Sequence, residues 1–401
     1  MRPADPAYRW VVLAAGVFAQ ASSAAVLQGL PGLGPKLRSD YHLTLTGLGA
    51  LFGSVTVGLV STLLLWGALA DRYGERRVMG GGLVVASGAL LEATQTTKVI
   101  PLALCLVLAG AFGASVNAAS GRAVFGWFGP EQRGFAMGVR QTALPLGAGL
   151  SAAVLPPLAS RHGLDAAFVA LAGFTTLGAV IVLALIREAP TQQAGAVSGP
   201  HPARDPRIRR MAWASLLLVV PQFAVVAFLV VYLHDEQGFS VAAAALVLAG
   251  VQLGGGAARI IAGRWADRLG LRVLPLRRIA AVTAGLFGLL AALTATGGPV
   301  VPVLLVAGVT AISWNGLAFT VVGELAGPGR AGAALGFQNT AVALGAALTP
   351  PLLGALVEGT DWAVAWAGAA VAAVVAVVAL GSLARNERPQ LALLEPGAFP
   401  A

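Results

Sequence analysis

The chain has 401 residues, of which 57% are hydrophobic and only 11% are charged. Because soluble globular domains are about a quarter charged, this composition excludes an ordinary soluble protein and predicts one that lies in a bilayer. The net charge is +9, yet the sequence has no basic helix or basic patch with interleaved aromatic residues, which argues against nucleic-acid binding. The single cysteine, Cys105, excludes an intrachain disulfide.

Twelve apolar runs follow one another along the chain, each long enough to cross a hydrocarbon core of about 30 Å. The first has a positively charged flank but no clear cleavage site, so we interpret it as a retained span rather than a signal peptide. The expected spans cover residues 11–30, 46–66, 78–96, 100–121, 135–158, 165–186, 211–233, 241–263, 278–296, 300–322, 334–357 and 362–384. This pattern predicts an all-α membrane protein with twelve transmembrane helices.

A polar stretch rich in proline, glycine and glutamine separates the first six spans from the last six. The predicted organisation is an N-terminal six-helix half over residues 1–186, a cytoplasmic linker over 187–210, a C-terminal six-helix half over 211–384, and a disordered cytoplasmic tail over 385–401.

The distribution of cations predicts the orientation. With a cytoplasmic N-terminus, 19 of the 26 lysines and arginines fall in inner segments and four in outer segments. Positive residues stay on the cytoplasmic side, so we expect a multi-pass protein of the cytoplasmic membrane with both termini inside the cell. The remaining three cations, Arg122, Arg140 and Arg259, fall within the spans when each end is placed to within a few residues.

Two charged loops repeat at half the chain length. The loop over residues 67–77 has the pattern GALADRYGERR, and the loop over 263–272 has GRWADRLGLR, with their aspartates 196 residues apart. A second pair, residues 138–147 (GVRQTALPLG) and 336–345 (GFQNTAVALG), repeats with an offset of 198. Internal repeats of this kind are typical of transporters, whose substrate sites lie between the repeats near the bilayer midplane.

On these motifs the chain resembles the major facilitator superfamily from Trp10 to Ala384, and it is most similar to the branches of bacterial organic-anion and inorganic-anion carriers. The loops over residues 130–134 and 324–330 resemble the E-x-x-R-type loops of that superfamily. Residues 144–149 match the fifth-span pattern of drug:proton antiporters only loosely, which weakens a drug-efflux interpretation. The resemblance implies two pseudo-symmetric halves that rock around a central cavity.

The resemblance also implies a cytoplasmic latch that closes one face of the transporter. Its expected members are Asp71, Arg72, Arg76, Arg77, Glu131, Arg133, Asp267, Arg268, Arg272, Glu324 and Arg330. The alternative is that these arginines only set the topology.

Arg259 is the leading candidate for substrate contact. It lies eight residues before Asp267, which places it about 12 Å further into the membrane along a helix. Its fork of donors suits a carboxylate or nitrate, and several anion carriers that the chain resembles have an arginine at about this spacing. The alternative is a structural cation bonded to helix carbonyls. For Arg122 and Arg140, which could extend toward the cytoplasm, a structural or gating role is slightly favoured over substrate contact.

No obvious buried carboxylate neutralises these three arginines, so an anionic substrate is expected to do so. Glu92, near the outer end of its span, is the candidate coupling residue. The full set of candidate substrate-binding residues is Arg259, Arg140, Arg122, Asn117, Gln20, Gln141, Gln222, Gln252, Asn315, Gln338 and Asn339. The alternative for each amide is a hydrogen bond to a neighbouring helix.

The sequence contains neither a P-loop nor an H-E-x-x-H motif, so we expect no enzyme activity, cofactor or metal. It predicts a secondary active transporter, acting as a monomer, that carries a small organic anion such as a monocarboxylate, with a proton as the candidate coupling ion. Two alternatives stay open: a proton-coupled exporter of amphiphilic compounds, and a receptor that binds a ligand without moving it.

Overall fold

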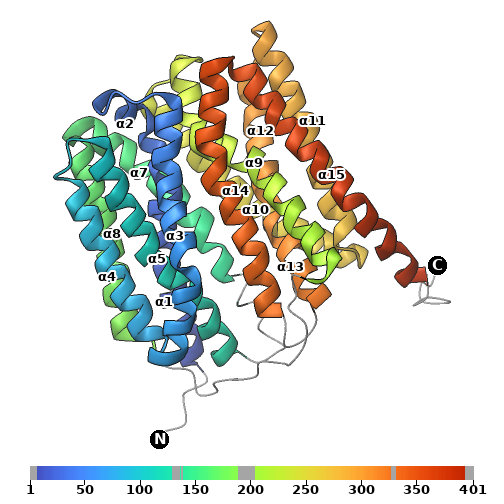
Figure 1. Ribbon diagram of the computed structural model, residues 1–401, viewed down its shortest axis with the longest axis horizontal. Coiled ribbons are helices and arrows are strands. Elements are labelled where there is room, and N and C mark those ends of the chain that lie inside the picture. Colours follow the sequence, from blue (N-terminus) through green and yellow to red (C-terminus); the bar gives the residue numbers. More distant parts are fainter. Residues whose placement is uncertain (1–6, 129–135, 137–138, 188–203, 327–330, 393–401) are drawn as a thin grey trace, which may run out of the picture. The chain divides into compact units, whose positions relative to one another are not determined.

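The computed structural model describes residues 7–128, 136, 139–187, 204–326 and 331–392, and every regular element among them is a helix (Figure 1). The first group of elements is α1 (Tyr8–Gly29), η1 (Leu30–Leu33), α2 (Gly34–Asp40), α3 (Leu45–Tyr73), α4 (Glu75–Ala93), α5 (Val99–Trp127), α7 (Ala143–His162) and α8 (Leu164–Leu185). The second is α9 (Pro206–Asp235), α10 (Val241–Leu269), α11 (Val273–Thr296), α12 (Val300–Ser313), α13 (Asn315–Ala326), α14 (Ala331–Gly359) and α15 (Trp362–Ala392).

In the described part of the chain, eleven helical segments are long and apolar enough to cross a membrane. The twelfth expected span, 78–96, forms α4, which has 19 residues and carries Arg76 and Arg77 at one end and Glu92 at the other. These charges lower its mean hydropathy below that of the other spans. The helix still packs along α5 and α8, so it is part of the same bundle.

The structure differs from the expected spans in three places. The residues between the first two expected spans form η1 and α2. The span expected over 300–322 is interrupted at Trp314, between α12 and α13. The last helix, α15, continues to Ala392, so residues 385–392 are helical where a disordered tail was expected.

The continuation of α15 has a physical cause in Glu387. Its carboxylate accepts hydrogen bonds from the main-chain N–H groups of Val273 and Leu274, at 2.9 and 3.0 Å, and from that of Arg272. These groups open α11 and have no partner within that helix. A carboxylate is favoured at this end by the helix dipole, so Glu387 ties the end of α15 to the start of α11.

By its contacts the chain forms two compact units. The first comprises residues 1–194, 226–253 and 350–358, and the second comprises 195–225, 254–349 and 359–401. The first unit therefore includes parts of α9, α10 and α14, which the sequence assigns to the C-terminal half. Contacts join each of these helices to the first unit. Arg38 of α2 pairs with Asp235 at the end of α9, Glu358 near the end of α14 accepts a hydrogen bond from the main-chain N–H of Thr46 at 3.0 Å, and Gly149 of α7 lies against Leu253 of α10.

Glycines bring α3 and α5 of the first unit into backbone contact. A Cβ atom on Gly58 would overlap the carbonyl oxygen of Val107, and one on Gly110 would overlap that of Val55. Each helix thus presents a glycine to the other's backbone, a kind of contact common between membrane helices. Elsewhere in this unit, Ser87 of α4 donates a hydrogen bond to the carbonyl oxygen of Ala172 in α8 at 2.9 Å.

Candidate functional site

The first unit holds a buried polar cluster built from α1, α5 and the residues just before α7. Gln20 Nε2 donates to Asn117 Oδ1 at 2.8 Å. Arg140 Nε donates to Ser120 Oγ at 2.8 Å, and its Nη2 atom donates to Gln20 Oε1 at 3.3 Å and to the Asn117 carbonyl oxygen at 3.2 Å. Its Nη1 atom donates to Gln141 Oε1 at 3.3 Å. Four of the candidate residues therefore meet here, joined by Ser120.

The guanidinium of Arg140 is held only by neutral acceptors in this cluster. The residue is 8% exposed, and the described ion pairs of the chain do not include it. Within the described part of the chain, no carboxylate therefore pairs with the buried guanidinium of Arg140. The side chain of Arg140 thus lies in the polar cluster.

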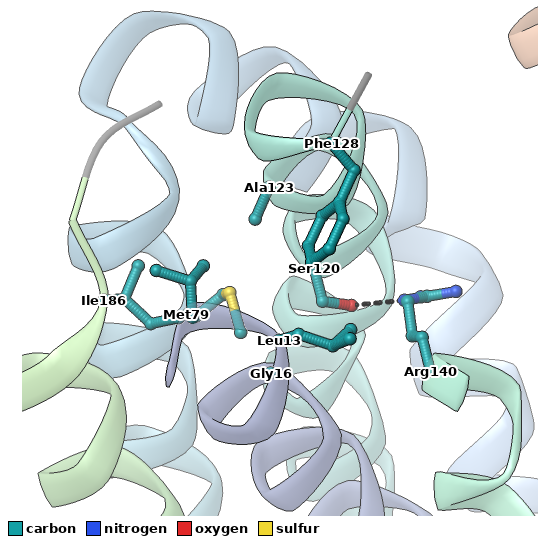
Figure 2. A pocket seen from close by; sticks show the side chains of 9 residues that line it. Leu13, Gly16, Met79, Ser120, Ala123, Phe128, Arg140 and Ile186 are labelled. Atoms are coloured by element: carbon teal, nitrogen blue, oxygen red, sulfur yellow. Dashed lines mark hydrogen bonds between the residues drawn. The ribbon is translucent and has the colours of Figure 1, made fainter. Parts of the chain in front are cut away.

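A small pocket lies against this cluster (Figure 2). Figure 2 shows Ser120 reaching Arg140, with Leu13, Gly16, Met79, Ala123, Phe128 and Ile186 around the hollow. The pocket holds about 10 Å³, which is about what a single water molecule needs. The pocket is too small and too apolar to hold an organic anion. The candidate site in this unit therefore consists of the polar residues of the cluster rather than of the pocket.

The second unit contains a similar amide pair. Asn315 Nδ2 donates to Gln222 Oε1 at 3.0 Å, which joins the start of α13 to α9. Asn315 stands 198 residues after Asn117, the offset of the second sequence repeat, whereas Gln222 stands 202 residues after Gln20. The asparagines therefore keep the register of the repeat, and their glutamine partners are displaced from it by about one helical turn. Gln338 of α14 donates to Ser215 Oγ of α9 at 3.0 Å.

Arg259, on α10, meets the second unit's interrupted helix. Its Nε atom donates to the carbonyl oxygen of Ile312, near the end of α12, at 2.9 Å. Next to this carbonyl, Ser313 Oγ donates to the carbonyl oxygen of Thr310 at 2.8 Å. Side chains therefore occupy two acceptors beside the break at Trp314, which is a recognised cause of an interrupted helix.

The two outer nitrogens of Arg259, Nη1 and Nη2, make no hydrogen bond with any residue that the structure describes, and no described carboxylate pairs with them. The side chain is partly buried. Arg259 thus offers a free fork of donors, whereas each nitrogen of Arg140 is already engaged. The Nε atom bonds a helix carbonyl, as the interpretation of Arg259 as a structural cation requires. The Nη1 and Nη2 atoms have no partner among the described residues, as substrate contact requires.

The remaining candidate residues are Gln252, Asn339, Glu92 and Arg122. Gln252 is 1% exposed, and its Nε2 atom has no partner among the described residues. Asn339 is partly buried, and Glu92 is exposed on α4. The side chain of Arg122 lies outside the described part of the structure.

The expected latch is described in part. In the second unit Arg272 pairs with Asp267 and, through Nε at 3.3 Å, with Glu324, while Arg268 is exposed. In the first unit Arg72, Arg76 and Arg77 are exposed, and Arg72 lies 5.3 Å from the ring centre of Tyr73. The side chain of Asp71 and residues Glu131, Arg133 and Arg330 lie outside the described residues.

Three groups that make the hydrogen bonds described above were not predicted from the sequence. Ser215 lies seven residues before Gln222, two helical turns away on the same face, a spacing that could have revealed it. Glu387 stands just beyond an apolar run, where no local pattern indicates a partner more than a hundred residues away. The Ile312 carbonyl is a main-chain group and leaves no signal in the sequence.

Among the residues that the structure describes, no three His, Cys, Asp or Glu side chains come together in a way that could hold a metal. Many apolar helices and buried, hydrogen-bonded arginines and amides define a polytopic membrane protein with a polar interior. The family model of the Major Facilitator Superfamily matches residues 16–350. The chain therefore belongs to the Major Facilitator Superfamily and has its all-helical transporter fold.

Curated relatives and solved structures agree with this membership. An uncharacterized MFS-type transporter of Mycobacterium tuberculosis is 38% identical over 91% of this chain and 83% of its own length. A human protein, monocarboxylate transporter 11, is 26% identical over 89% and 79%, and a probable sulfoacetate transporter of Cupriavidus necator is 24% identical over 81% and 82%. A bacterial homologue of the human lysosomal transporter Spinster superimposes with a TM-score of 0.73 and 16% identity over 96% of both chains.

Proposed function

We propose that this protein is a secondary transporter that moves a small organic anion, such as a monocarboxylate, across the cytoplasmic membrane by alternating access of its two halves. Both termini lie in the cytoplasm, in keeping with the excess of arginines in the inner segments. The observation that carries the proposal is the fork of Arg259, a partly buried guanidinium whose Nε bonds the Ile312 carbonyl and whose Nη1 and Nη2 have no partner among the described residues.

The chemistry of this fork favours an oxyanion. Two parallel N–H groups match the two oxygens of a carboxylate or sulfonate, and such bidentate bonds are among the strongest that side chains form. The Nε bond to Ile312 fixes the plane of the guanidinium, so that little side-chain freedom is lost when the ligand binds. Two of the relatives named above are described as carriers of a monocarboxylate and of sulfoacetate, both of which are anions.

The test is a thermal-shift screen of the detergent-purified protein with small carboxylates, small sulfonates and lipophilic cations. A ligand that binds only the native state raises the midpoint of unfolding. We expect a carboxylate or sulfonate to stabilise the wild type but not Arg259→Ala. Arg264→Ala removes an exposed arginine from the same helix and serves as the matched control, with a response equal to that of the wild type.

Other outcomes identify other functions. Stabilisation by lipophilic cations alone would favour an exporter of amphiphilic compounds. Stabilisation by an anion without flux of that anion in proteoliposomes would favour a receptor. An anion that stabilises the wild type and Arg259→Ala equally would remove Arg259 from the site.

A further inference from the structure

Two arginines from different helices of the second unit meet on the last helix, α15. Helices α11 and α15 pack side by side (Figure 1). Arg277 of α11 donates through Nε to the carbonyl oxygen of Val377 at 3.2 Å, and a Cβ atom on Gly381 would stand 3.7 Å from its Nη2 atom. Arg210 of α9 donates through Nη1 to Ser382 Oγ. Since Gly381 and Ser382 are adjacent in the chain, the two guanidinium groups contact neighbouring positions of α15.

No carboxylate that the structure describes in the second unit pairs with either of these arginines. Each described carboxylate of the unit has another partner: Asp205 pairs with Arg207, Asp267 and Glu324 pair with Arg272, Asp361 accepts a hydrogen bond from the main-chain N–H of Val364, and Glu387 caps α11. Two positive groups near each other repel. An anion that contacts both guanidinium groups removes this repulsion, so the pair favours an anionic ligand.

The guanidinium groups also have donors to spare. Arg277 uses only Nε, and Arg210 uses only Nη1, in the hydrogen bonds that they make with described residues. Arg210 is exposed, and Arg277 is partly buried, so a ligand at the surface of the unit can reach this end of the three helices. Guanidinium groups bind phosphate oxygens through paired hydrogen bonds, and phosphate therefore fits the unused donors.

The pair lies at the depth where a membrane helix leaves the hydrocarbon core. The membrane-spanning segment of α15 ends at Arg385, and Ser382 comes three residues earlier, about 4.5 Å along a helix. On α9, Trp213 stands three residues after Arg210 and is 65% exposed. Tryptophan is enriched where a membrane helix meets the lipid headgroups. The two arginines are therefore placed at the level of those headgroups.

An apolar stripe on α15 leads from the membrane core to the same place. Val371, Val375 and Val378 are 62%, 47% and 72% exposed. Ser382 follows Val378 by four residues, and a spacing of three or four residues places successive side chains on one face of a helix. This face is apolar along its length and cationic at its end, which matches an acyl chain that ends in a negatively charged headgroup.

We propose that Arg210, Arg277 and Ser382 form a binding site for an anionic phospholipid. The phosphate accepts hydrogen bonds from both guanidinium groups, and an acyl chain lies along the valine stripe of α15. Basic pockets between membrane helices are suited to such headgroups. The bound lipid links α9 and α11 to α15, because it contacts an arginine from each. This site is separate from the fork of Arg259 and does not depend on which substrate the protein carries.

The test measures lipid binding to the full-length, delipidated protein in detergent by native mass spectrometry. The probes are phosphatidylglycerol and phosphatidylcholine with the same acyl chains, which differ in the net charge of the headgroup. We expect the wild type to bind phosphatidylglycerol more tightly. Arg210→Gln and Arg277→Gln should each weaken that binding about fivefold, the effect of one arginine on an anionic headgroup. Arg264→Gln is the matched control, because it removes an exposed arginine of α10 and should leave the binding unchanged.

A second pair of variants leaves both arginines in place. Ser382→Asp puts a carboxylate beside Arg210, where it neutralises one of the two charges, and we expect phosphatidylglycerol binding to weaken as in Arg210→Gln. Ser382→Asn has the shape of aspartate without its charge and should bind this lipid as the wild type does. These two variants test the site even where a glutamine variant does not fold.

Equal binding of the two lipids by the wild type would overturn the proposal. A preference for phosphatidylglycerol that Ser382→Asp and the folded glutamine variants leave unchanged would also overturn it, because the charge that attracts the lipid would then lie elsewhere. Inorganic phosphate is the third probe: displacement of phosphatidylglycerol by an equal concentration of phosphate would show a site for free anions rather than for a lipid. None of these outcomes changes the proposed function, which Arg259→Ala tests with carboxylates.

Discussion

Gly58 and Gly110 allow α3 and α5 to touch through their backbones, and this contact leaves no room for a side chain. We therefore expect Gly58→Ala to lower the free energy of unfolding by about 1–3 kcal/mol, the usual cost of overpacking. Denaturant titration of the detergent-purified protein measures the change.

Gly88 of α4 provides the control for this prediction, since a Cβ there would meet no neighbouring atom. Gly88→Ala should be neutral or raise stability by about 0.5–1 kcal/mol, because alanine favours a helix more than glycine does. Equal effects of the two substitutions would show that the α3–α5 contact is looser than described.

At the scale of residues, the sequence predicts which residue types form the candidate site better than it predicts which of them bond to one another. The spacing of Arg259 from the charged loop places it inside a span, and the structure shows it there with a free fork. The amides Gln20, Asn117, Gln222 and Asn315 were candidates for substrate binding, with a hydrogen bond to a neighbouring helix as the alternative, and the structure shows them bonded to each other in two pairs. Pairing depends on which helices are neighbours, and a pattern of polar residues within single spans does not contain that information.

At the scale of helices, Glu387 links α15 to α11 by capping three main-chain N–H groups. We expect Glu387→Ala to expose these amides, so that Arg272, Val273 and Leu274 exchange hydrogen for deuterium several-fold faster, with a loss of about 0.5–2 kcal/mol, typical for a removed cap. Hydrogen exchange followed by mass spectrometry on peptides from the start of α11 measures this.

Arg385→Ala alters an exposed residue of α15 and should leave the exchange unchanged. Protection of residues 272–274 that is the same with and without Glu387 would show that other groups hold the start of α11.

The position and type of most helices could be predicted from hydropathy, because about 20 consecutive apolar residues have few other structures open to them. The interruption at Trp314 could not be predicted, because it occurs where Arg259 of another helix donates a hydrogen bond to the Ile312 carbonyl oxygen. The length of α15 could not be predicted either, because Glu387 in its last turns caps α11, a helix more than a hundred residues earlier in the chain. Both are long-range contacts, which a local pattern does not specify.

At the scale of the whole molecule, the sequence repeat predicts two halves, and contacts at one end of the bundle complicate that division. The pair Arg38–Asp235 and the packing of Gly34 against Val231 attach the end of α9 to α2 in the first unit. The sequence repeat does not predict these contacts, because they join residues that are not equivalent in the two halves.

The Arg38–Asp235 pair should hold these ends together. Its side chains are 40% and 31% exposed, and a pair of this kind contributes about 0.2–1 kcal/mol, so we expect Arg38→Gln to increase local opening about 1.4- to fivefold. Val231→Cys in a Cys105→Ser background reports the opening, because residue 231 is buried and a water-soluble maleimide reaches it only when the contact opens.

The charge-swapped variant Arg38→Asp with Asp235→Arg should return the labelling rate toward that of the starting protein. Lys36→Gln, at a neighbouring cation that pairs with Asp40 instead, should leave the rate unchanged. Labelling that is indifferent to Arg38 would show that the pair does not hold the contact closed.

The cap of α11 also bears on the order in which the protein is made. A ribosome releases the chain from its N-terminus, and domains fold as their residues become available. Helix α11 is complete once Thr296 has emerged, yet the carboxylate that caps its first turn belongs to Glu387, 91 residues further along the chain. The start of α11 therefore acquires this cap only after α12 to α15 have been synthesised, and a nonsense mutation between codons 297 and 387 yields a chain whose α11 stays uncapped by Glu387.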